Sequence, residues 1–485
     1  MKLKFLFCLL LPTVVFSSLS AKSRSDVSFV RDVAPVLLKR CSGCHGEKIN
    51  LGGYRVSSFN YLMKKGASGQ AAVTPGKPEG STIFRLISTS LPSMRMPKGD
   101  DPLTTAQVLV IKKWISEGAK FDGTDPAASL RSAMGPRQHP AAPTIYRSAP
   151  PVLALSLISG SAAGAPVVAV GGYNEVTLWD ASSGSLLRRI GDLPQRIQAL
   201  SCSADGKYLL VAGGTPGEYG EASLVDLHSG GKPTVICTAT DVLLTAVYSQ
   251  DATRIGVGGA DGAVSVFDAS TLKKMWTSSL HSDWVTSISF SADGNFVASA
   301  SRDMTVKLHN AADGSLYTTY SGHCKQLGQY KGQDPVYSVR FLSTGCDALS
   351  AGGGKWIQVW NAEKAKEDSG SAADMEERFA KQGHTRYLPH NSPLPVFALA
   401  MSGNSLFAAS GDGAVREFDI NGLKEVKTYT GHKDWVYSLD YNAGDHRLAS
   451  GAFNGEVRIW NTDTGECTCR FVAQPGAITK KVTLR

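Results

Sequence analysis

From residue 151 onward, apolar and polar positions recur in a fixed order. Each unit has an apolar strand, a polar turn, a second strand ending in small residues, and a third strand ending in an aromatic residue plus Asp or Asn. The units end at Trp179-Asp180, Val225-Asp226, Phe267-Asp268, His309-Asn310, Trp360-Asn361, Phe418-Asp419 and Trp460-Asn461, the second being a weaker match. This period predicts seven small antiparallel sheets that bury their faces against their neighbours.

Before the repeats, apolar residues recur at helical spacing instead. A helix is predicted from about Thr105 to Glu117, because Thr104 and Gln107 form a capping box at its start. Gly118 stands where a glycine ends a helix. An earlier helical stripe precedes a Cys pair and consists of Phe29, Val33, Val36 and Leu37.

The first twenty residues are typical of a secretory signal. Lys2 and Lys4 form a basic start, residues 5–16 form a short apolar core, and small residues place cleavage near Ser20. An apolar core of about a dozen residues is short for a membrane-spanning helix, which needs about 20. We therefore expect an exported protein, periplasmic or otherwise outside the cytoplasm, with no transmembrane helix after signal cleavage.

Changes in composition and apolar periodicity along the chain predict four parts. The signal, residues 1–20, is followed by a small helical domain, 21–122, and by a linker rich in Pro and Ala, 123–150. The repeats occupy residues 151–485. A charged insertion at Ala362–Lys381 lengthens one repeat, and we expect it to lie on the surface.

The net charge is unevenly distributed among these parts. The whole chain of 485 residues has a net charge of +8, and residues 22–122 alone hold sixteen Lys or Arg against eight Asp or Glu. The excess positive charge therefore belongs to the helical domain, whose partner we expect to present an acidic docking face. Lys39, Arg40 and Lys48 flank the Cys pair and are the cations expected near it. We expect no nucleic-acid partner.

One motif carries chemistry. Cys41-Ser42-Gly43-Cys44-His45 is C-x-x-C-H, the attachment motif of c-type haem, in which two thiols form thioethers and the adjacent His ligates iron. A thioredoxin-like pair would not need the His, and a zinc site would want a second ligand pair before the repeats. We therefore predict one covalently attached haem c.

The iron also needs a sixth ligand or an open site. Met96 is followed by Pro97 in a loop, and thioether ligation is typical of electron-transfer cytochromes. We predict Met96 as this ligand, with Met94 as the reserve; either Met could instead simply line the haem crevice.

The other Cys after the signal are expected to be small apolar fillers of the repeats, with one disulfide as the alternative: Cys202, Cys237, Cys324, Cys346, Cys467 and Cys469.

Residues 29–119 resemble the cytochrome c-like domain common in planctomycetes. The resemblance is carried by FVRDVAPVL at 29–37, the haem motif, PGKPEGS at 75–81, Met96-Pro97, and Trp114-Ile115 with Gly118-Ala119. It implies haem binding, electron transfer and a place outside the cytoplasm. The family often has a second Pro after Met-Pro, where Lys98 stands here.

The repeats resemble the WD-repeat family. The resemblance is carried by the unit endings, by Ser-x-Asp-Gly turns at 203–206 and 291–294, and by the Gly-His steps at 322–323, 383–384 and 431–432. It implies that the His residues serve internal hydrogen-bond relays rather than metal sites: His281, Ser299 and Asp303 with His309 in place of Trp, and His432, Ser450 and Trp460 with Asn454 in place of Asp. The predicted fold is a small all-α cytochrome c domain followed by an all-β seven-bladed WD-repeat propeller.

Aligning the units predicts one rim of the ring. The residues just before the first strands should lie there: Pro151, Arg196, Val242, Trp284, Pro335, Pro395 and Trp435. Exposed Trp is enriched at binding hot spots, so we expect Trp284, Trp435 and Arg196 to contribute to protein docking. The alternative is that each Trp merely covers its own blade.

Three functions fit this organisation. The first is an exported electron carrier, not a catalyst on its own, whose propeller docks a protein partner. The second is a haem-dependent oxidoreductase with a substrate site in the propeller. The third is a haem-based sensor, which would need a labile sixth ligand.

Overall fold

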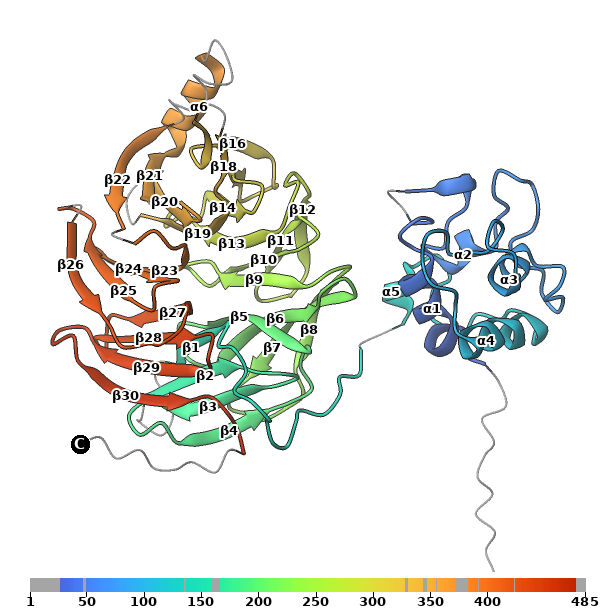
Figure 1. Cartoon of the computed structure of the whole chain (residues 1–485), viewed down its shortest axis with the longest axis horizontal. Helices are drawn as coiled ribbons and strands as arrows, with labels where there is room; N and C mark the ends of the chain where they lie inside the picture. The colour runs from blue at the N-terminus through green and yellow to red at the C-terminus, as the bar shows by residue number, and fades with distance from the viewer. Residues whose placement is uncertain are drawn as a thin grey trace, which may run out of the picture. The chain divides into compact units, whose positions relative to one another are not determined.

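The computed structural model describes most of the chain, in the ranges 27–46, 49–134, 137–158, 166–327, 330–342, 347–354, 356–371, 383–390, 392–422 and 424–476. The predicted signal and Lys48 lie outside these ranges. The chain divides into two compact units, Met1–Arg137 and Gln138–Arg485, each with its own core (Figure 1). Among the described residues, no helix is long and apolar enough to cross a membrane.

The first unit consists of short helices joined by irregular segments. Their bounds are η1 (Phe29–Val33), α1 (Ala34–Arg40), η2 (Leu51–Gly53), α2 (Phe59–Leu62), α3 (Thr82–Ser88), α4 (Thr105–Ser116) and α5 (Leu130–Ala133). The predicted helix from Thr105 is confirmed as α4. Both hydrogen bonds of the capping box between Thr104 and Gln107 are present, and Gly118 has a φ of 97°, which favours glycine at a helix end.

An aromatic cluster forms the centre of this unit. The Phe29 ring lies 5.0 Å from the Phe59 ring and 5.3 Å from the Trp114 ring, measured between centroids. Phe29, Trp114 and Leu37 are almost completely buried, so the helical stripe that precedes the Cys pair packs against α4. Leu130 of α5 is fully buried in the same core.

The second unit is a ring of seven four-stranded antiparallel sheets, which confirms the seven-bladed β-propeller (Figure 1). Blade 1 holds β1 (Leu155–Ile158), β2 (Val167–Gly171), β3 (Val176–Asp180) and β4 (Leu186–Ile190). Blade 2 holds β5 (Arg196–Cys202), β6 (Tyr208–Thr215), β7 (Tyr219–Asp226) and β8 (Thr234–Ala239). Blade 3 holds β9 (Leu243–Tyr248), β10 (Arg254–Gly259), β11 (Val264–Asp268) and β12 (Lys274–Ser278). Blade 4 holds β13 (Val285–Phe290), β14 (Phe296–Ser301), β15 (Val306–Asn310) and β16 (Leu316–Tyr320).

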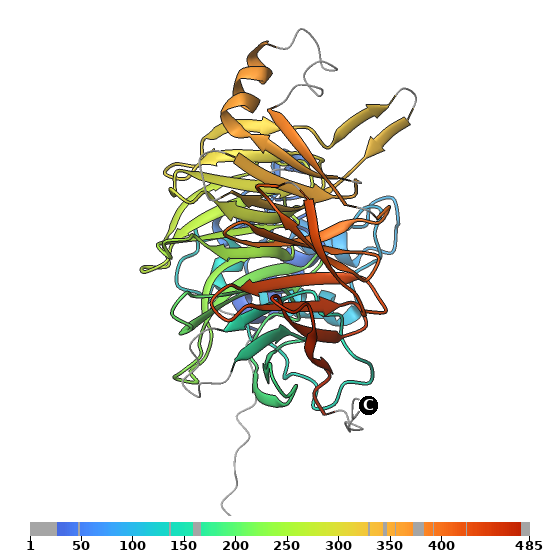
Figure 2. The ribbon, with the colours of Figure 1, turned by 90° about the vertical axis from the view of Figure 1, so that its left-hand side faces the viewer.

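Two insertions interrupt the second half of the ring. Blade 5 holds β19 (Val336–Phe341), β20 (Asp347–Gly352), β21 (Trp356–Asn361) and β22 (His384–Pro389). Blade 6 holds β23 (Val396–Ser402), β24 (Ser405–Ser410), β25 (Val415–Asp419) and β26 (Lys424–Tyr429), and blade 7 holds β27 (Val436–Asn442), β28 (Arg447–Ala452), β29 (Glu456–Asn461) and β30 (Cys467–Val472). The hairpin of β17 (Cys324–Leu327) and β18 (Tyr330–Gln333) and the helix α6 (Ala362–Ser371) project from the ring (Figure 2).

The ring closes by packing of blade 7 on blade 1. Each blade takes its four strands consecutively from the chain, so no strand is shared across the closure. Asp440 on β27 accepts hydrogen bonds from the Leu157 backbone N–H at 2.8 Å and the Ser156 hydroxyl at 3.0 Å, both on β1. The Ser438 hydroxyl donates to the Val152 carbonyl at 2.9 Å. These bonds and a shared apolar core hold the first and last blades together.

The predicted His relays are present inside the blades. In blade 4, His281 contacts Asp303 and Ser299, both at 2.8 Å, and Ser299 reaches His309 at 3.3 Å. Buried polar groups need such partners, which accounts for the His without a metal. The described residues contain no cluster of three or more His, Cys, Asp or Glu that could hold a metal ion.

Blade 7 departs from the predicted relay at one position. His432 and Trp460 both contact the Ser450 hydroxyl at 2.8 Å, as expected. The other ring nitrogen of His432 lies 3.1 Å from a Glu456 carboxylate oxygen, so the carboxylate partner comes from Glu456 and not from the position of Asn454.

Blade 5 has a further relay. One of the three Gly-His steps, at Gly383, has a different place in its blade from the expected one. In blade 5 the Ser350 hydroxyl contacts His323 at 2.8 Å and Trp360 at 3.1 Å. The step at Gly383 does not precede a first strand, because His384 begins the outer strand β22.

The stretch 123–150 contributes to both units rather than spanning open space. Its first part includes α5, which is buried in the core of the first unit. In its second part, His139 lies 3.0 Å from the buried Glu221 carboxylate, and the buried Tyr146 hydroxyl donates to Glu175 at 2.7 Å. Six Cys have free thiols, so no disulfide joins any two of them: Cys41, Cys44, Cys202, Cys237, Cys467 and Cys469.

Candidate functional site

The C-x-x-C-H motif forms one turn at the end of α1. The Cys44 and His45 backbone N–H groups both donate to the Cys41 carbonyl, at 3.3 and 2.9 Å, so the chain continues the helical direction through the motif. One turn separates the two Cys, as attachment to one edge of a porphyrin requires. Gly46 then lets the chain turn back, because a Cβ at this position would lie 2.5 Å from the Ser42 carbonyl oxygen.

The imidazole of His45 is held by the segment that follows. Its Nδ1 lies 3.2 Å from the Tyr54 carbonyl oxygen, and the two rings meet edge to face at 5.6 Å. A carbonyl only accepts, so Nδ1 carries the proton and Nε2 keeps its lone pair. Metal-ligating His residues are held in this way, with the second ring nitrogen bonded to a carbonyl or carboxylate. The Val56 N–H donates to the His45 carbonyl at 2.8 Å, which ties this segment to the motif.

The two thiols differ in environment. Cys41 packs against the apolar core of the unit, and burial raises the pKa of its thiol to about 11. Cys44 is exposed on the same turn. The partly buried Cys41 places one edge of the motif against the core, and the exposed Cys44 places the other towards solvent.

The structure distinguishes the two candidate Met residues. Met96 is partly buried and packs against the same core as Cys41, whereas the Met94 side chain is 55% exposed. Arg40, the residue before Cys41, forms an ion pair with Asp100 at 3.2 Å and donates to the Asp101 carbonyl. The loop after Met96 is therefore fastened beside the haem motif. Arg40 is engaged by this loop and not simply presented as a surface charge.

A buried guanidinium atom lies next to Met96 in the chain. The Nε of Arg95 has no hydrogen-bond partner among the described residues. An unpaired buried donor is costly, and it fits a bound group that carries carboxylates, as haem does through its propionates. Cys41, Cys44, His45 and Met96, with the unpaired Arg95 next to Met96 in the chain, therefore fit a covalently attached haem.

A hollow of about 320 Å³ adjoins this site through Tyr54. Its lining holds three basic residues and no acidic one: Asn50, Gly53, Tyr54, Arg55, Tyr61, Lys64 and Lys65. Lys64 and Arg55 lie over the Tyr61 ring, at 4.8 and 5.3 Å from its centroid. We call this feature the basic hollow. The sequence analysis did not single out these residues; the run Lys64-Lys65 near Arg55 was the available signal.

The predicted rim residues of the propeller are exposed where expected in three blades. Trp284 is 38% and Trp435 48% exposed, and Arg196 is also exposed. The Arg302 guanidinium lies 4.3 Å from the Trp284 ring centroid, and Arg196 lies 5.8 Å from the Tyr173 ring.

The strand register of the first blade agrees with this alignment. Leu155 pairs with Val170 in blade 1 as Leu439 pairs with Ser450 in blade 7. Pro151 and Trp435 each lie four residues before these positions, so Pro151 takes the equivalent place in its blade.

An aromatic patch on this rim was missed by the sequence analysis. The rings of Tyr337 and Phe397 lie 5.5 Å apart, those of Phe397 and Tyr437 4.4 Å, and those of Phe397 and Trp435 5.9 Å. Phe453 continues the contacts at 5.8 Å from Tyr437. We call these five residues the aromatic rim patch. An aromatic residue two positions after each rim residue in blades 5, 6 and 7 was the signal for it.

Two family models match the chain in separate places. The one described as planctomycete cytochrome C matches residues 41–100, which includes the C-x-x-C-H motif and Met96. The one described as WD domain, G-beta repeat, matches residues 272–310 and 423–461, in the propeller. The predicted resemblance is thereby confirmed: the seven-bladed propeller is similar in two places to WD repeats, and residues 41–100 before it are similar to planctomycete cytochrome C.

Individual relatives match the propeller at low identity. They include the WD repeat-containing protein 1 of Gallus gallus, 24% identical over 60% of this chain and 45% of its own length. The eukaryotic translation initiation factor 3 subunit I of Botryotinia fuckeliana is 25% identical over 56% of this chain and 77% of its own. The guanine nucleotide-binding protein subunit beta of Zea mays is 24% identical over 59% and 70%. The chain spans less than half of the first of these, and the likeness supports a protein-interaction scaffold.

Proposed function

We propose that this protein is an exported c-type cytochrome that carries one haem c and transfers electrons, with the propeller as a protein-docking scaffold. One observation carries the proposal: the C-x-x-C turn presents both thiols from one helical end while the Tyr54 carbonyl holds Nδ1 of His45 and leaves Nε2 as a ligand. When bound, haem supplies reversible one-electron chemistry.

The residues around the site have separate roles in this proposal. Cys41 and Cys44 attach the group, and His45 and Met96 are its axial ligands. The packing of Met96 against the core favours it over the exposed Met94. The ion pair between Arg40 and Asp100 keeps the ligand loop near the motif and so limits exchange of the sixth ligand.

The attachment is tested on the full chain, produced with a cytochrome c maturation system. Cys41→Ala and Cys44→Ala should each abolish stable attachment, measured by pyridine haemochrome analysis after acid–acetone extraction. Cys202→Ala, which removes a partly buried thiol of the propeller, is the matched control and should keep its haem. A full haem complement that resists extraction in both motif variants would show that this assignment is wrong.

The axial ligand is tested by a matched pair of variants. Met96→Ala should remove any methionine-to-iron charge-transfer band, open the reduced protein to carbon monoxide and lower the midpoint potential. Met94→Ala should leave all three unchanged. The reverse result would move the ligand to Met94, and carbon monoxide binding by the unmodified protein would favour a sensor.

We also propose that an acidic face of a redox partner docks at the basic hollow. Three cations line it without an acidic neighbour, and charges of one sign steer encounter. The double variant Lys64→Glu/Lys65→Glu should slow bimolecular electron transfer to an acidic acceptor at low salt. Lys77→Glu/Lys120→Glu, at two exposed residues outside the hollow, makes the same change of charge and should have a smaller effect. Rates that are independent of ionic strength would exclude steering.

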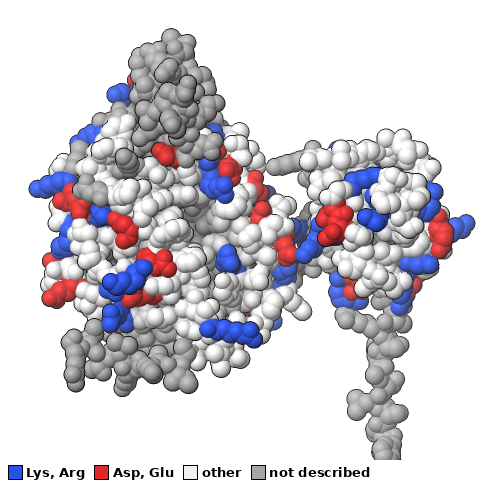
Figure 3. All heavy atoms as spheres, in the orientation of Figure 1, with Lys and Arg blue, Asp and Glu red and all other residues white. Residues whose placement is uncertain are grey.

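The propeller should dock its partner through the rim that carries Trp284, Trp435 and Arg196. The aromatic rim patch extends this surface with partly exposed rings, which is typical of binding hot spots. On the face seen in Figure 3, positive and negative side chains of the propeller are interspersed. In cross-linking experiments in cells, the variant Trp284→Ala/Trp435→Ala should lose a partner that the wild type captures, once its folding and haem content have been checked. An unchanged set of partners would indicate that each Trp only covers its own blade.

Export completes the proposal. The N-terminal signal pattern and the need of c-type haem attachment for a compartment outside the cytoplasm both support it. Fractionation of cells should recover the haem-loaded chain in the periplasmic or secreted fraction.

A further inference from the structure

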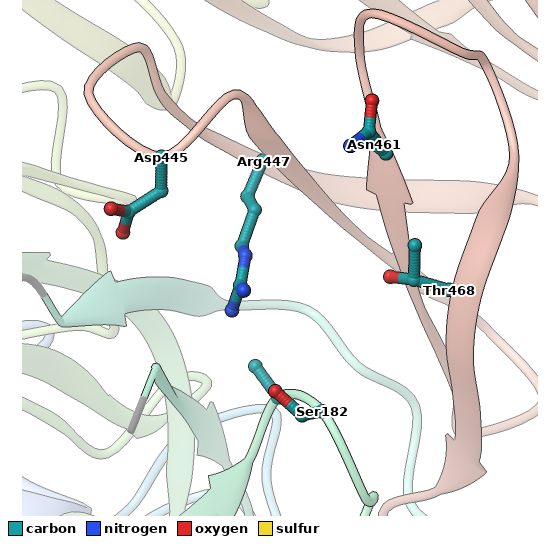
Figure 4. Close-up of a pocket in the computed structure, with 6 residues that line it drawn as sticks. Ser182, Asp445, Arg447, Asn461 and Thr468 are labelled. Carbon is teal, nitrogen blue, oxygen red and sulfur yellow. The ribbon is translucent and has the colours of Figure 1, made fainter. Parts of the chain in front are cut away.

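A second hollow lies in the propeller, where blade 7 meets blade 1. It has a volume of about 250 Å³ and is lined by Ala181, Ser182, Asp445, Arg447, Asn461 and Thr468 (Figure 4). At about 30 Å³ for each water molecule, this volume corresponds to roughly eight waters. We call it the closure pocket. Nothing in the proposed cytochrome function uses it.

Arg447 is the charged group at the centre of this pocket. It begins β28, pairs with Asn461 on β29, and extends its side chain towards Ser182 (Figure 4). Its Nη1 atom is buried and has no hydrogen-bond partner among the described residues. A buried donor of a charged group that stays unpaired costs more than an ordinary lost hydrogen bond, so a partner is expected.

The propeller supplies an internal comparison for this arginine. Arg254 begins β10 and pairs with Asp268, so it occupies in blade 3 the position that Arg447 occupies in blade 7. Its guanidinium donates to the Gly294 carbonyl in the next blade at 2.7 Å. The same position is therefore satisfied by protein in blade 3, whereas in blade 7 no described residue bonds Nη1 of Arg447. Hydrogen bonds from the Ser183 and Ser182 backbone lower the pKa of the Asp180 carboxylate, and the charge of Arg447 contributes to the same shift.

The remaining polar groups of the pocket wall are mainly donors. The Asn461 side-chain oxygen already accepts the N–H groups of Asp463 and Thr464, at 2.9 and 3.0 Å, which leaves its amide NH₂. Ser182 is exposed on the turn after β3 and offers a hydroxyl. Asp445 is the one carboxylate of the lining, and one of its oxygens accepts from the Asn442 amide at 3.1 Å.

We propose that the closure pocket binds a small organic anion, with its carboxylate or phosphate oxygens on Arg447 and its hydroxyl groups towards Asp445 and Ser182. Guanidinium groups suit such oxyanions because they present paired donors in one plane. The volume is below that of pockets for drug-sized ligands, which limits the ligand to the size of a sugar acid or sugar phosphate.

The experiment uses the full chain and three probes in isothermal titration calorimetry. Gluconate is a hydroxylated carboxylate, sorbitol is its uncharged counterpart of equal carbon number, and inorganic phosphate is the minimal oxyanion. We expect saturable binding of gluconate, weaker binding of phosphate and none of sorbitol. Arg447→Met, which keeps an unbranched apolar stem, should weaken gluconate binding about 10- to 100-fold, and Arg254→Met should not change it.

A second variant keeps the test decisive if Arg447→Met does not fold. Ser182 is exposed on a turn, so Ser182→Trp should fold and fill the pocket, and it should abolish gluconate binding. Phosphate binding that both pocket variants remove would support the oxyanion assignment. The proposal is overturned if neither gluconate nor phosphate binds saturably, if sorbitol binds as well as gluconate, or if Ser182→Trp binds gluconate like the wild type. None of these outcomes depends on haem, so they leave the cytochrome proposal untouched.

Discussion

Replacing the relay serine of blade 5 should destabilise the propeller more than the same replacement in blade 4. The Ser350 hydroxyl lies 2.8 Å from Nε2 of His323 and accepts from Nε1 of Trp360 at 3.1 Å, and all three side chains are buried. Ser350→Ala removes the shared partner of both rings. Each buried donor left unpaired costs about 1–3 kcal/mol, so the loss of both should be about 2–6 kcal/mol.

The equivalent serines in two other blades supply the comparison. Ser450 in blade 7 has the same two partners, His432 and Trp460, both at 2.8 Å, so Ser450→Ala should cost as much. Ser299 in blade 4 has one short contact, to His281, and two longer ones of 3.3 Å, to His309 and to the Lys307 carbonyl. Burial lowers the pKa of His309 to about 4, so this ring is neutral and can accept as well as donate. Ser299→Ala should therefore cost about 1–3 kcal/mol.

The assay is urea unfolding followed by Trp fluorescence, with hydrogen exchange of blade peptides as a local readout. All three variants should unfold at lower urea with an unchanged slope, and the shift should be smallest for Ser299→Ala. Exchange should rise first in the blade that carries the substitution. The reasoning would be refuted if Ser350→Ala were as stable as the wild type, or if Ser299→Ala were the most damaging of the three.

Three other predictions follow from single contacts. Burial acts to raise the pKa of Asp303, but the hydrogen bond and charge of His281 outweigh burial and hold that pKa below its usual value. The ionised Asp303 therefore stabilises the fold above about pH 4, and this stabilisation is lost as the pH falls further. Asp303→Asn should remove this acid-dependent part of the stability, measured by denaturant titrations at pH 7 and pH 3. Gly46→Ala should lower haem incorporation, because its Cβ would meet the Ser42 carbonyl, and pyridine haemochrome yield per protein measures this. Tyr146→Phe should loosen the stretch before blade 1, which limited proteolysis would detect, since its hydroxyl bonds a buried carboxylate there.

Local signals in the sequence account for the parts that were predicted well. The helix α4 follows from its own capping box and Gly118, because both act within a few residues of the helix ends. The seven blades follow from the repeated strand endings, since each blade is a contiguous unit whose strands pair with their sequence neighbours. The turn of the C-x-x-C-H motif is equally local.

Other features depend on residues that only the ring brings together. The aromatic rim patch joins Tyr337, Phe397 and Tyr437, which lie in three blades and touch because neighbouring first strands run side by side. The replacement of an expected Asp by Glu456 in the last relay was decided by which side chain could reach His432.

The closure pocket shows most clearly what the sequence could not determine. Arg254 and Arg447 hold the same place in their units, each opposite the last residue of the third strand. One meets the Gly294 carbonyl of the next blade and the other opens on a hollow where the last blade meets the first. Sequence periodicity determines what each blade is, because its signals lie within the unit. Contacts between blades decide which polar groups are satisfied, because a hydrogen bond depends on the distance between atoms that the chain brings together only when the ring closes.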